Sequence, residues 1–385
     1  MKRIVLFGSQ ITTGGAQQVL LDQADWFHAH GYNVWAVFFY DKDGLQQQWS
    51  SRHAFPITVL STYNRGAGLR KNLVGILYGF FHLVLLLKQL RPDYIECFTH
   101  DADTLGIPAA FLAGVKGRFG THHGQFAGQS RKAVKLHTWI INSFLSSALI
   151  CVSARAERQA LEEGIRPDRI RVIFNGVKPV AKDPAVRAAV RAELGLAEDQ
   201  VMILNVGRLT PEKAQVRLAE AAASLADSMP GLRFFIAGEG PCREELEKQI
   251  AGSKAGQNFT LLGNRSDVDR LLNAADLFVL YSDTEGMPVS LMEAMSAGLP
   301  CIASDLEGIA QLIPDERFGI LIPAGDSGLL AETIRKTLAD PVSAAGKGQA
   351  AAERIRESFT LSASCRQYEE AFSTLSKGSR KAEER

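Results

Sequence analysis

Short apolar runs alternate with longer segments of helical periodicity along the whole chain. The runs have the length of strands, and the segments between them repeat apolar residues three or four positions apart, as one face of a helix does. Strands that alternate with helices form parallel sheets, so the pattern predicts α/β architecture. In the first half, the expected elements are strands at Arg3–Phe7, Asn33–Phe39, Tyr94–Phe98, Gly117–Thr121 and Ala148–Val152, and helices at Ala16–His30 and Leu73–Leu90.

The second half repeats this alternation, and each half opens with a strand that ends at a glycine, Gly8 or Gly207. Between the halves, Asn175–Gln200 breaks the pattern with an Asn-Gly pair, prolines and an Ala-rich charged stretch. We therefore predict two doubly wound domains, with ligands at the carboxyl ends of their strands. The second-half elements are strands at Val201–Val206, Arg233–Ala237, Phe259–Leu262, Leu277–Leu280 and Pro300–Ala303, and helices at Pro211–Ala226, Arg243–Ala251, Val268–Asn273 and Val289–Ala297.

The run from Leu73 to Leu87 needs a membrane test, because His82 is its only strongly polar residue. A helix that spans a bilayer needs about 20 apolar residues, and this run is shorter. We therefore expect a buried helix between the sheet and its neighbours. At the N-terminus only Ile4–Phe7 is apolar before Gly8, which is too short for a signal sequence and typical of a first buried strand.

The composition is that of a globular protein: 385 residues, of which 46% are hydrophobic and 22% are charged. Lys plus Arg number 43 and Asp plus Glu number 42, which argues against a nucleic-acid-binding protein with a strongly basic surface. The five cysteines form no C-x-x-C pair. We therefore expect reduced thiols in a cytoplasmic protein, with neither a disulfide framework nor a zinc site.

The segment TEGMPVSLME carries two carboxylates around the start of a predicted helix. Pro288 is suited to begin that helix, whose free N–H groups can bind a phosphate. Glu285 lies in the loop before it, and Glu293 about one and a half turns into it. Each carboxylate can accept hydrogen bonds from a sugar diol. Equally, Glu285 could be no more than a negative charge near the helix N-terminus, and Glu293 could be a surface residue. Both interpretations stay open.

A second charged cluster, GRLTPEK, follows the first strand of the second half. Thr210 is suited to cap a helix, Pro211 to occupy its first position, and Lys213 then falls at the third. A lysine there opposes the helix dipole unless an anion lies between them. With Arg208, it could bind a diphosphate, although a lone lysine is more often solvated.

Glycine turns and histidines follow other expected strands. Gly14-Gly15 precedes the first helix and allows a ligand to approach the backbone closely, and Gly238–Pro241 is a similar turn. The sequence contains neither G-x-G-x-x-G at these turns nor a P-loop motif, which disfavours standard dinucleotide and NTPase sites. His122-His123 follows the fourth expected strand and could donate to a sugar hydroxyl, although a single histidine is more often structural.

A basic stretch with aromatic neighbours lies in the first half. It comprises Arg131, Lys132 and Lys135, with Phe126 and Trp139 nearby. Such residues could face phospholipid headgroups or an anionic acceptor. Because charge runs are common on helix surfaces, a solvated helix face is the favoured interpretation.

Together these motifs resemble the GT-B glycosyltransferases of family 4, which are retaining enzymes that use nucleotide sugars. The resemblance covers nearly the whole chain, from Gly14-Gly15-Ala16 to Phe359–Tyr368. Its most specific part is the Glu-x7-Glu motif in EGMPVSLMEAMSAGLPCIASD. It is supported by GRLTPEK, IAGEGP, FTLLGNRSDVDRLLNAADLFVLYS, CVSA and IRVIFNGV.

The resemblance implies the GT-B fold, with two doubly wound Rossmann-like domains that face each other across a cleft. Residues 1–178 would bind the acceptor, and a C-terminal helix at about 357–376 would return to this domain. Residues 198–356 would bind the nucleotide sugar.

Four residues would act in catalysis by this resemblance. Glu285 would hold hydroxyl groups of the donor sugar. Arg208 and Lys213 would neutralise the donor diphosphate in place of a metal. His123, rather than His122, matches the family's histidine and would contact the donor sugar near the reaction centre.

Further residues would bind the donor. Glu293 would hold the ribose, Gly15 would approach the phosphate, and the backbone around Arg265 would lie near the base. The remaining expected donor-binding residues are Gly14, Gly238, Gly286, Met287, Val289 and Ser290.

A few positions depart from the family's pattern. Ala214 stands where a glycine or an asparagine is common, and Lys178 replaces an acid after Asn-Gly-Val. Gln17 and Gln18 replace a commoner Glu-Arg pair, which leaves the recognition of the acceptor open.

We therefore expect a retaining glycosyltransferase that moves a sugar from a nucleotide sugar, with a UDP-sugar favoured, to a glycan or lipid-linked acceptor. The expected setting is bacterial cell-surface polysaccharide or glycolipid synthesis, in the cytoplasm with peripheral contact at the inner membrane face. We expect no metal, no other cofactor and no nucleic-acid partner. Alternatives are a catalytically silent nucleotide-sugar-binding subunit and a GT-B epimerase; a nicotinamide dehydrogenase is disfavoured by the missing glycine fingerprint.

Overall fold

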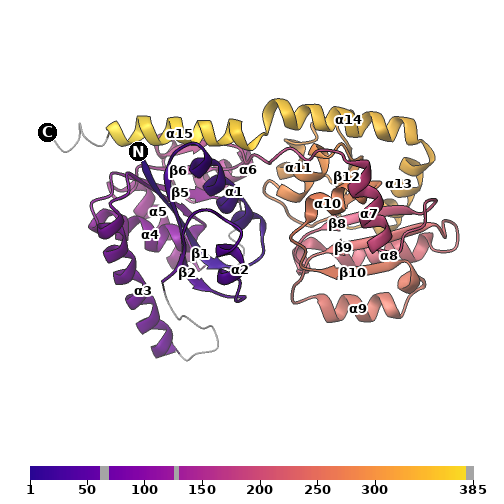
Figure 1. The fold of residues 1–385 in the computed structure, drawn as a ribbon, viewed down its shortest axis with the longest axis horizontal. Helices are drawn as coiled ribbons and strands as arrows, with labels where there is room; N and C mark the ends of the chain where they lie inside the picture. Colours follow the sequence, from indigo (N-terminus) through magenta and orange to yellow (C-terminus); the bar gives the residue numbers. More distant parts are fainter. Residues whose placement is uncertain (61–68, 125–129, 379–385) are drawn as a thin grey trace. The chain divides into compact units, whose positions relative to one another are not determined.

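The computed structural model describes residues 1–60, 69–124 and 130–378, and the chain divides into two compact units. The first unit comprises Met1–Gly176 and Leu361–Arg385, and the second comprises Val177–Thr360. In each unit, helices cover a central sheet (Figure 1). The strand pairs of both sheets are parallel, which confirms the predicted doubly wound architecture.

The first unit has a seven-stranded sheet in the order β3-β2-β1-β4-β5-β6-β7. Its strands are β1 (Arg3–Ile11), β2 (Asn33–Asp41), β3 (Ile57–Val59), β4 (Tyr94–Phe98), β5 (Gly117–His122), β6 (Ala148–Cys151) and β7 (Ile170–Val172). Its helices are α1 (Gly15–Ala29), α2 (Gln46–Ser50), α3 (Leu69–Leu90), α4 (His100–Leu112), α5 (Arg131–Asn142), α6 (Ala154–Glu162), the 3-10 turn η1 (Pro167–Arg169) and the C-terminal α15 (Leu361–Gly378).

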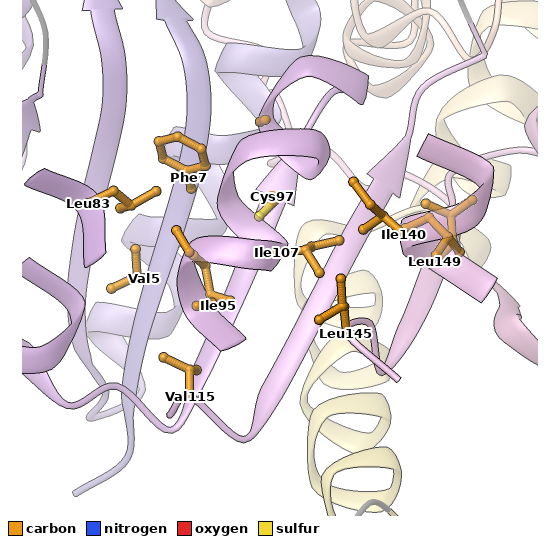
Figure 2. Close-up of a cluster of buried hydrophobic side chains, with 14 of the residues drawn as sticks. Val5, Phe7, Leu83, Ile95, Cys97, Ile107, Val115, Ile140, Leu145 and Leu149 are labelled. Carbon is orange, nitrogen blue, oxygen red and sulfur yellow. The ribbon is translucent and has the colours of Figure 1, made fainter. Parts of the chain in front are cut away.

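Helices cover both faces of this sheet. Because successive side chains of a strand point to opposite faces, Val5 and Phe7 of β1 share one face, where they pack with Leu83 of α3 and with residues of α4 and α5 (Figure 2). On the other face, Phe372 of α15 stacks on Phe27 of α1, with 6.0 Å between the ring centroids. The C-terminal helix is thus part of the first unit's core.

The second unit has a six-stranded sheet in the order β10-β9-β8-β11-β12-β13. Its strands are β8 (Val201–Val206), β9 (Leu232–Ala237), β10 (Phe259–Gly263), β11 (Leu277–Leu280), β12 (Cys301–Ser304) and β13 (Ile320–Ile322). Its helices are α7 (Pro184–Glu193), η2 (Pro211–Lys213), α8 (Gln215–Leu225), α9 (Arg243–Ala251), η3 (Lys254–Gln257), α10 (Val268–Ala274), α11 (Val289–Ser296), α12 (Glu307–Ala310), α13 (Ser327–Ala339) and α14 (Pro341–Ser358).

The sequence pattern missed three strands, β3, β7 and β13. Each has three residues and forms one edge of its sheet. A segment this short is below the usual strand length and carries almost no periodic signal.

Two predicted helices differ from the structure. The segment expected as one helix from Pro211 to Ala226 is a 3-10 turn followed by α8, which begins at Gln215. The helix expected to be buried, α3, is buried on one side only, because Leu83 is inaccessible whereas Phe81 is 61% exposed. No helix in the described ranges is long and apolar enough to cross a membrane.

Candidate functional site

The second unit brings the two charged motifs together where the strand order reverses. The strands β8 and β11 are neighbours in the sheet, but the chain leaves them toward opposite edges. The loops after two such strands diverge and leave a crevice, which is where open α/β sheets bind ligands. The loop after β8 carries Arg208 and Lys213, and the loop after β11 carries Ser282 and Glu285.

An ion pair joins these two loops. The Nζ atom of Lys213 donates to both carboxylate oxygens of Glu285, at 2.7 and 2.8 Å. The Oγ atom of Ser282 donates to Oε1 of the same carboxylate at 2.7 Å. The Glu285 side chain is only 3% exposed and that of Lys213 is 15% exposed. Since an unpaired charge is costly to bury, the pair holds both groups at fixed positions.

The turn before α8 directs Lys213 toward Glu285. The short helix η2 ends at Lys213, and its C-cap Ala214 is left-handed, with a φ of 47° and a ψ of 36°. Gln215 then begins α8, and its Nε2 donates to the Arg208 carbonyl at 2.8 Å. The prediction that Lys213 lies in the first turn of a long helix is therefore wrong. The charge of Lys213 is balanced by Glu285 across the crevice.

Arg208 remains more open than Lys213. Its guanidinium lies 3.6 Å from Glu212, and its side chain is 46% exposed. The backbone beside it is closely packed, because a Cβ atom on Gly238 would lie 2.0 Å from the Gly207 carbonyl oxygen. Only glycine at 238 lets the turns after β8 and β9 approach this closely.

The helix α11 begins at Val289, as its predicted bounds have it, and Pro288 is its N-cap rather than its first residue. Glu293 lies on the second turn and is half-buried, as are Val289 and Ser290, whereas Gly286 and Met287 are buried in the loop before the helix. The two glutamates thus belong to one loop–helix segment. The ribose, sugar and phosphate contacts expected of these residues stay predictions.

Arg265 follows β10 and is held by carboxylates. Its Nε donates to Asp267 at 2.8 Å and its NH2 group donates to Glu193 at 2.9 Å. These hydrogen bonds raise the pKa of Arg265 and lower the pKa of Asp267. The guanidinium of Arg265 is thus held by two acids, and the expected contact of its backbone with a base stays a prediction.

The other predicted residues belong to the first unit. Gly14 is the N-cap of α1 and Gly15 is its first residue, directly after β1. His123 follows β5, and its ring stacks on Phe98 with 5.9 Å between centroids. Burial lowers the pKa of His123 to about 4. The histidine is therefore neutral at physiological pH and can donate or accept a hydrogen bond but carries no charge.

His122 faces a cluster of buried polar groups that the sequence did not predict. Its Nδ1 accepts from the Gly124 amide at 3.0 Å. Nearby, His137 contacts Asp103 at 2.9 Å, and Thr121 donates to Glu96 at 3.1 Å. Burial lowers the pKa of His122 to about 3 and raises that of Glu96 well above its ordinary value. The adjacent histidines thus have different surroundings, and the donor-sugar contact expected of His123 stays a prediction.

Three residues that follow β11, β8 and β4 were not predicted. Ser282 precedes Glu285 by three residues, a spacing that could have indicated their contact. No sequence motif indicated that Gln215 would contact the Arg208 carbonyl. Thr99 follows β4 with a φ of 90°, and its Oγ1 donates to Ser9 at 3.2 Å. A positive φ is strained for a β-branched residue and is commonest at functional sites.

In residues 1–60, 69–124 and 130–378, which the structure describes, no group of three or more His, Cys, Asp or Glu side chains is arranged to hold a metal ion. The positive charges in the β8–β11 crevice come from Arg208 and Lys213.

Two protein-family models match successive parts of the chain. The model of Glycosyltransferase Family 4 matches residues 13–180, and the model of Glycosyl transferases group 1 matches residues 186–357. The matches correspond to the two halves in which the motifs lie.

Named relatives and solved structures agree with these models. The chain is 34% identical over 265 residues to the UDP-Gal:alpha-D-GlcNAc-diphosphoundecaprenol alpha-1,3-galactosyltransferase of Escherichia coli, covering 66% of this chain and 68% of the relative. It is 28% identical to the N,N'-diacetylbacillosaminyl-diphospho-undecaprenol alpha-1,3-N-acetylgalactosaminyltransferase of Campylobacter jejuni, covering 69% of this chain and 73% of that one. The fold matches that of Anabaena HepE in complex with UDP-glucose, with a TM-score of 0.84 at 23% identity over 96% of this chain and 99% of HepE.

Proposed function

The chain belongs to the retaining GT-B glycosyltransferases of family 4 and group 1, and from this premise we propose that it transfers a sugar from a UDP-sugar to a lipid-linked or glycan acceptor. The observation that carries the proposal is the Lys213–Glu285 pair at the carboxyl ends of β8 and β11. It offers a cation for a diphosphate and, beside it, a carboxylate for sugar hydroxyls.

The donor and acceptor classes are supported by the relatives. The Escherichia coli relative takes UDP-Gal, and both named relatives act on a sugar attached to diphosphoundecaprenol. We extend to this chain the UDP part of the donor and the lipid-linked class of the acceptor. Synthesis of a cell-surface polysaccharide or glycolipid is the setting that fits such an acceptor.

The charges of the second unit suggest how the reaction is assisted. The bond between the sugar's anomeric carbon and the diphosphate oxygen breaks, and negative charge grows on the leaving UDP. Lys213 and Arg208 would stabilise that charge, and electrostatic stabilisation of this kind is usually the largest contribution to catalysis. Glu285 would hold the sugar's hydroxyl groups, already fixed by Lys213 and Ser282. The oxygen of the acceptor hydroxyl then bonds to the anomeric carbon on the same face of the sugar, and its proton passes to the departing diphosphate.

Two further groups would complete the donor site. Glu293 on α11 would accept hydrogen bonds from the ribose hydroxyls, which a half-buried carboxylate near a helix start can do. His123, whose pKa burial lowers to about 4, would contact the donor sugar as a neutral hydrogen-bonding group. Gly15 at the start of α1 would allow close approach to the phosphate.

Calorimetric titration tests this proposal, with UDP, GDP, ADP and NAD as probes and with and without a chelator. Selective binding of UDP is the expected result. Transfer of radiolabel from UDP-glucose, UDP-galactose and UDP-N-acetylglucosamine to an extract of diphosphate-linked lipids then identifies the donor. Preference for another nucleotide, or UDP-sugar epimerisation without an acceptor, would contradict the proposal.

A further inference from the structure

The helix α3 exposes a continuous stripe of large apolar side chains. Its members, each between 50% and 66% exposed, are Val74, Leu77, Tyr78, Phe81 and Leu85. Positions three or four residues apart lie on the same side of a helix, so these side chains form one row about 17 Å long at 1.5 Å per residue. Lys88 continues the row at its C-terminal end and is also exposed.

The fold does not need this row for its core. On the opposite side of α3, Leu83 and Leu87 are fully buried against the sheet, and Figure 2 shows Leu83 in that cluster. Exposed apolar side chains are ordinary when scattered, but a contiguous row of them marks an interaction surface.

The neighbouring helices extend the same surface. α4 packs against both α3 and α5. At the C-terminal end of α4, Phe111 and Leu112 are exposed, and the Phe111 ring contacts Phe144, which is 69% exposed, with 5.4 Å between centroids. Leu136 and Trp139 on α5 are also exposed. The apolar surface therefore crosses three adjacent helices.

Positive charges accompany this surface. Arg131, Lys132 and Lys135 are exposed on α5, and Lys116 is exposed just after α4. The sequences of α3 and α5 contain no acidic residue, and the two acids of α4 lie in its first turn, at the end away from Phe111. Phe126, which the sequence grouped with this basic stretch, lies outside the described residues.

We propose that this surface of α3, α4 and α5 lies on an anionic lipid bilayer, with the apolar row inserted among the acyl chains and the cations at the headgroups. The inference goes beyond the proposed function and stands on the surface alone. Exposed apolar and aromatic side chains beside Lys and Arg are the combination that binds such an interface. A second copy of the chain is disfavoured, because it would bring cations against cations.

The insertion is shallow. α3 keeps one side packed on the sheet, and no helix among the described residues could span a bilayer. Trp139 and Tyr78 have the amphipathic rings that prefer the headgroup region. Binding should therefore depend on both apolar area and lipid charge.

Vesicle flotation of the full chain tests the proposal, with phosphatidylcholine vesicles that contain or lack phosphatidylglycerol. The wild type should bind the anionic vesicles, with a blue shift of tryptophan fluorescence that Trp139→Phe removes. Replacing Tyr78, Phe81 and Leu85 together by serine should weaken binding at least about tenfold. The matched control replaces Leu161 of α6 and Val342 of α14 by serine. Both are exposed apolar residues outside the proposed surface, so this variant should bind vesicles as the wild type does.

A second variant tests the charges. Glutamine at positions 131, 132 and 135 should weaken binding to anionic vesicles by about 100-fold, and added salt should remove the difference. Because these side chains are exposed, the variants should fold and bind UDP as wild type, so UDP titration separates this proposal from the proposed function. Unchanged vesicle binding in both variants, or a serine variant that only abolishes dimerisation in sedimentation, would overturn it.

Discussion

The two units share a strand order yet treat their ionisable groups in opposite ways. In the second unit, Lys213 and Glu285 meet as an ion pair at 2.7 Å in the crevice between β8 and β11. In the first unit, the polar groups beside β4 and β5 are buried deeply enough to lose their charges. Burial raises the pKa of Glu96 well above its ordinary value and lowers that of His137 to about 4.

This difference separates two kinds of polar site on one fold. A permanent ion pair can exchange one partner for a ligand's charge, because the charges already exist and are held in place. A neutral buried cluster can only hydrogen-bond, and titrating it costs folding free energy. The topology supplies the crevice. Glu285 is itself only 3% exposed, so its pairing with Lys213, rather than its exposure, distinguishes it from Glu96, which accepts from Thr121.

The largest expected effect comes from breaking the pair on one side. Lys213→Met leaves the Glu285 carboxylate buried without its cation, which should lower the free energy of unfolding by about 3–5 kcal/mol. Replacing both residues by methionine should restore most of that stability, because an apolar pair of similar volume is tolerated. Scanning calorimetry measures both variants. A double variant as unstable as the single one would show that the pair is not the cause.

The hydrogen bond from Ser282 should rank next. Ser282→Ala removes a donor to a buried carboxylate, and such bonds contribute about 1.5–3 kcal/mol. If Glu285 holds the donor sugar, kcat/KM should fall by about 10- to 100-fold. Ser304→Ala is the control, since the Ser304 Oγ donates to the neutral Ser282 carbonyl at 2.7 Å. An equal fall in kcat/KM in the two variants would show that the hydrogen bond to the Glu285 carboxylate is no more important than the one to the Ser282 carbonyl.

We expect the first unit to lose stability in acid, because its buried histidines are neutral in the folded state. The pKa of His122 is lowered to about 3 in the folded state, against about 6.5 when unfolded. Its contribution is therefore complete above pH 6.5 and is lost as the pH falls toward 3. Between pH 8 and pH 5 the loss is about 2 kcal/mol, and His122→Gln should remove it from the pH dependence.

Tryptophan fluorescence in urea isolates this effect, because the four tryptophans all belong to the first unit: Trp26, Trp35, Trp49 and Trp139. The unfolding free energy is measured at pH 8 and at pH 5 for both proteins. If it changes by the same amount in His122→Gln as in the wild type, His122 is not the buried neutral group that causes the loss.

The smallest expected effect concerns the turn before α8. Ala214 has a left-handed φ of 47°, which disfavours residues with a Cβ atom. Ala214→Gly should therefore stabilise the second unit by about 0.5–1 kcal/mol, whereas Ala214→Val should destabilise it. A glycine or an asparagine adopts this conformation readily. Calorimetry that ranks alanine above glycine would show that the buried methyl group matters more.

Much of the fold followed from periodicity alone. The strands at Tyr94–Phe98, Val201–Val206 and Leu277–Leu280 were predicted with the bounds they have, because central parallel strands are continuous apolar runs between polar turns. The edge strands were missed because three residues carry no period. The exposure of α3 was missed because a helix apolar on all sides gives no sign of which side is buried.

The site was predictable as motifs but not as contacts. The sequence indicated the loops that carry Lys213 and Glu285, yet these residues lie 72 positions apart. Only the strand order brings β8 beside β11 and so joins them. The left-handed Ala214, which caps η2 and turns Lys213 toward the crevice, has no signal in hydrophobic patterning.

UDP titration of three proteins tests the central claim, that the β8–β11 crevice of the second unit is a preformed site for a diphosphate. The proteins are the wild type, the Lys213→Met, Glu285→Met double variant, and the Lys254→Met control. Lys254 pairs with Asp227 on the surface of the same unit, and such exposed pairs contribute little. We expect micromolar UDP binding in the wild type and control, and a loss of affinity of at least about tenfold in the double variant. Equal UDP affinity in all three proteins would contradict the central claim.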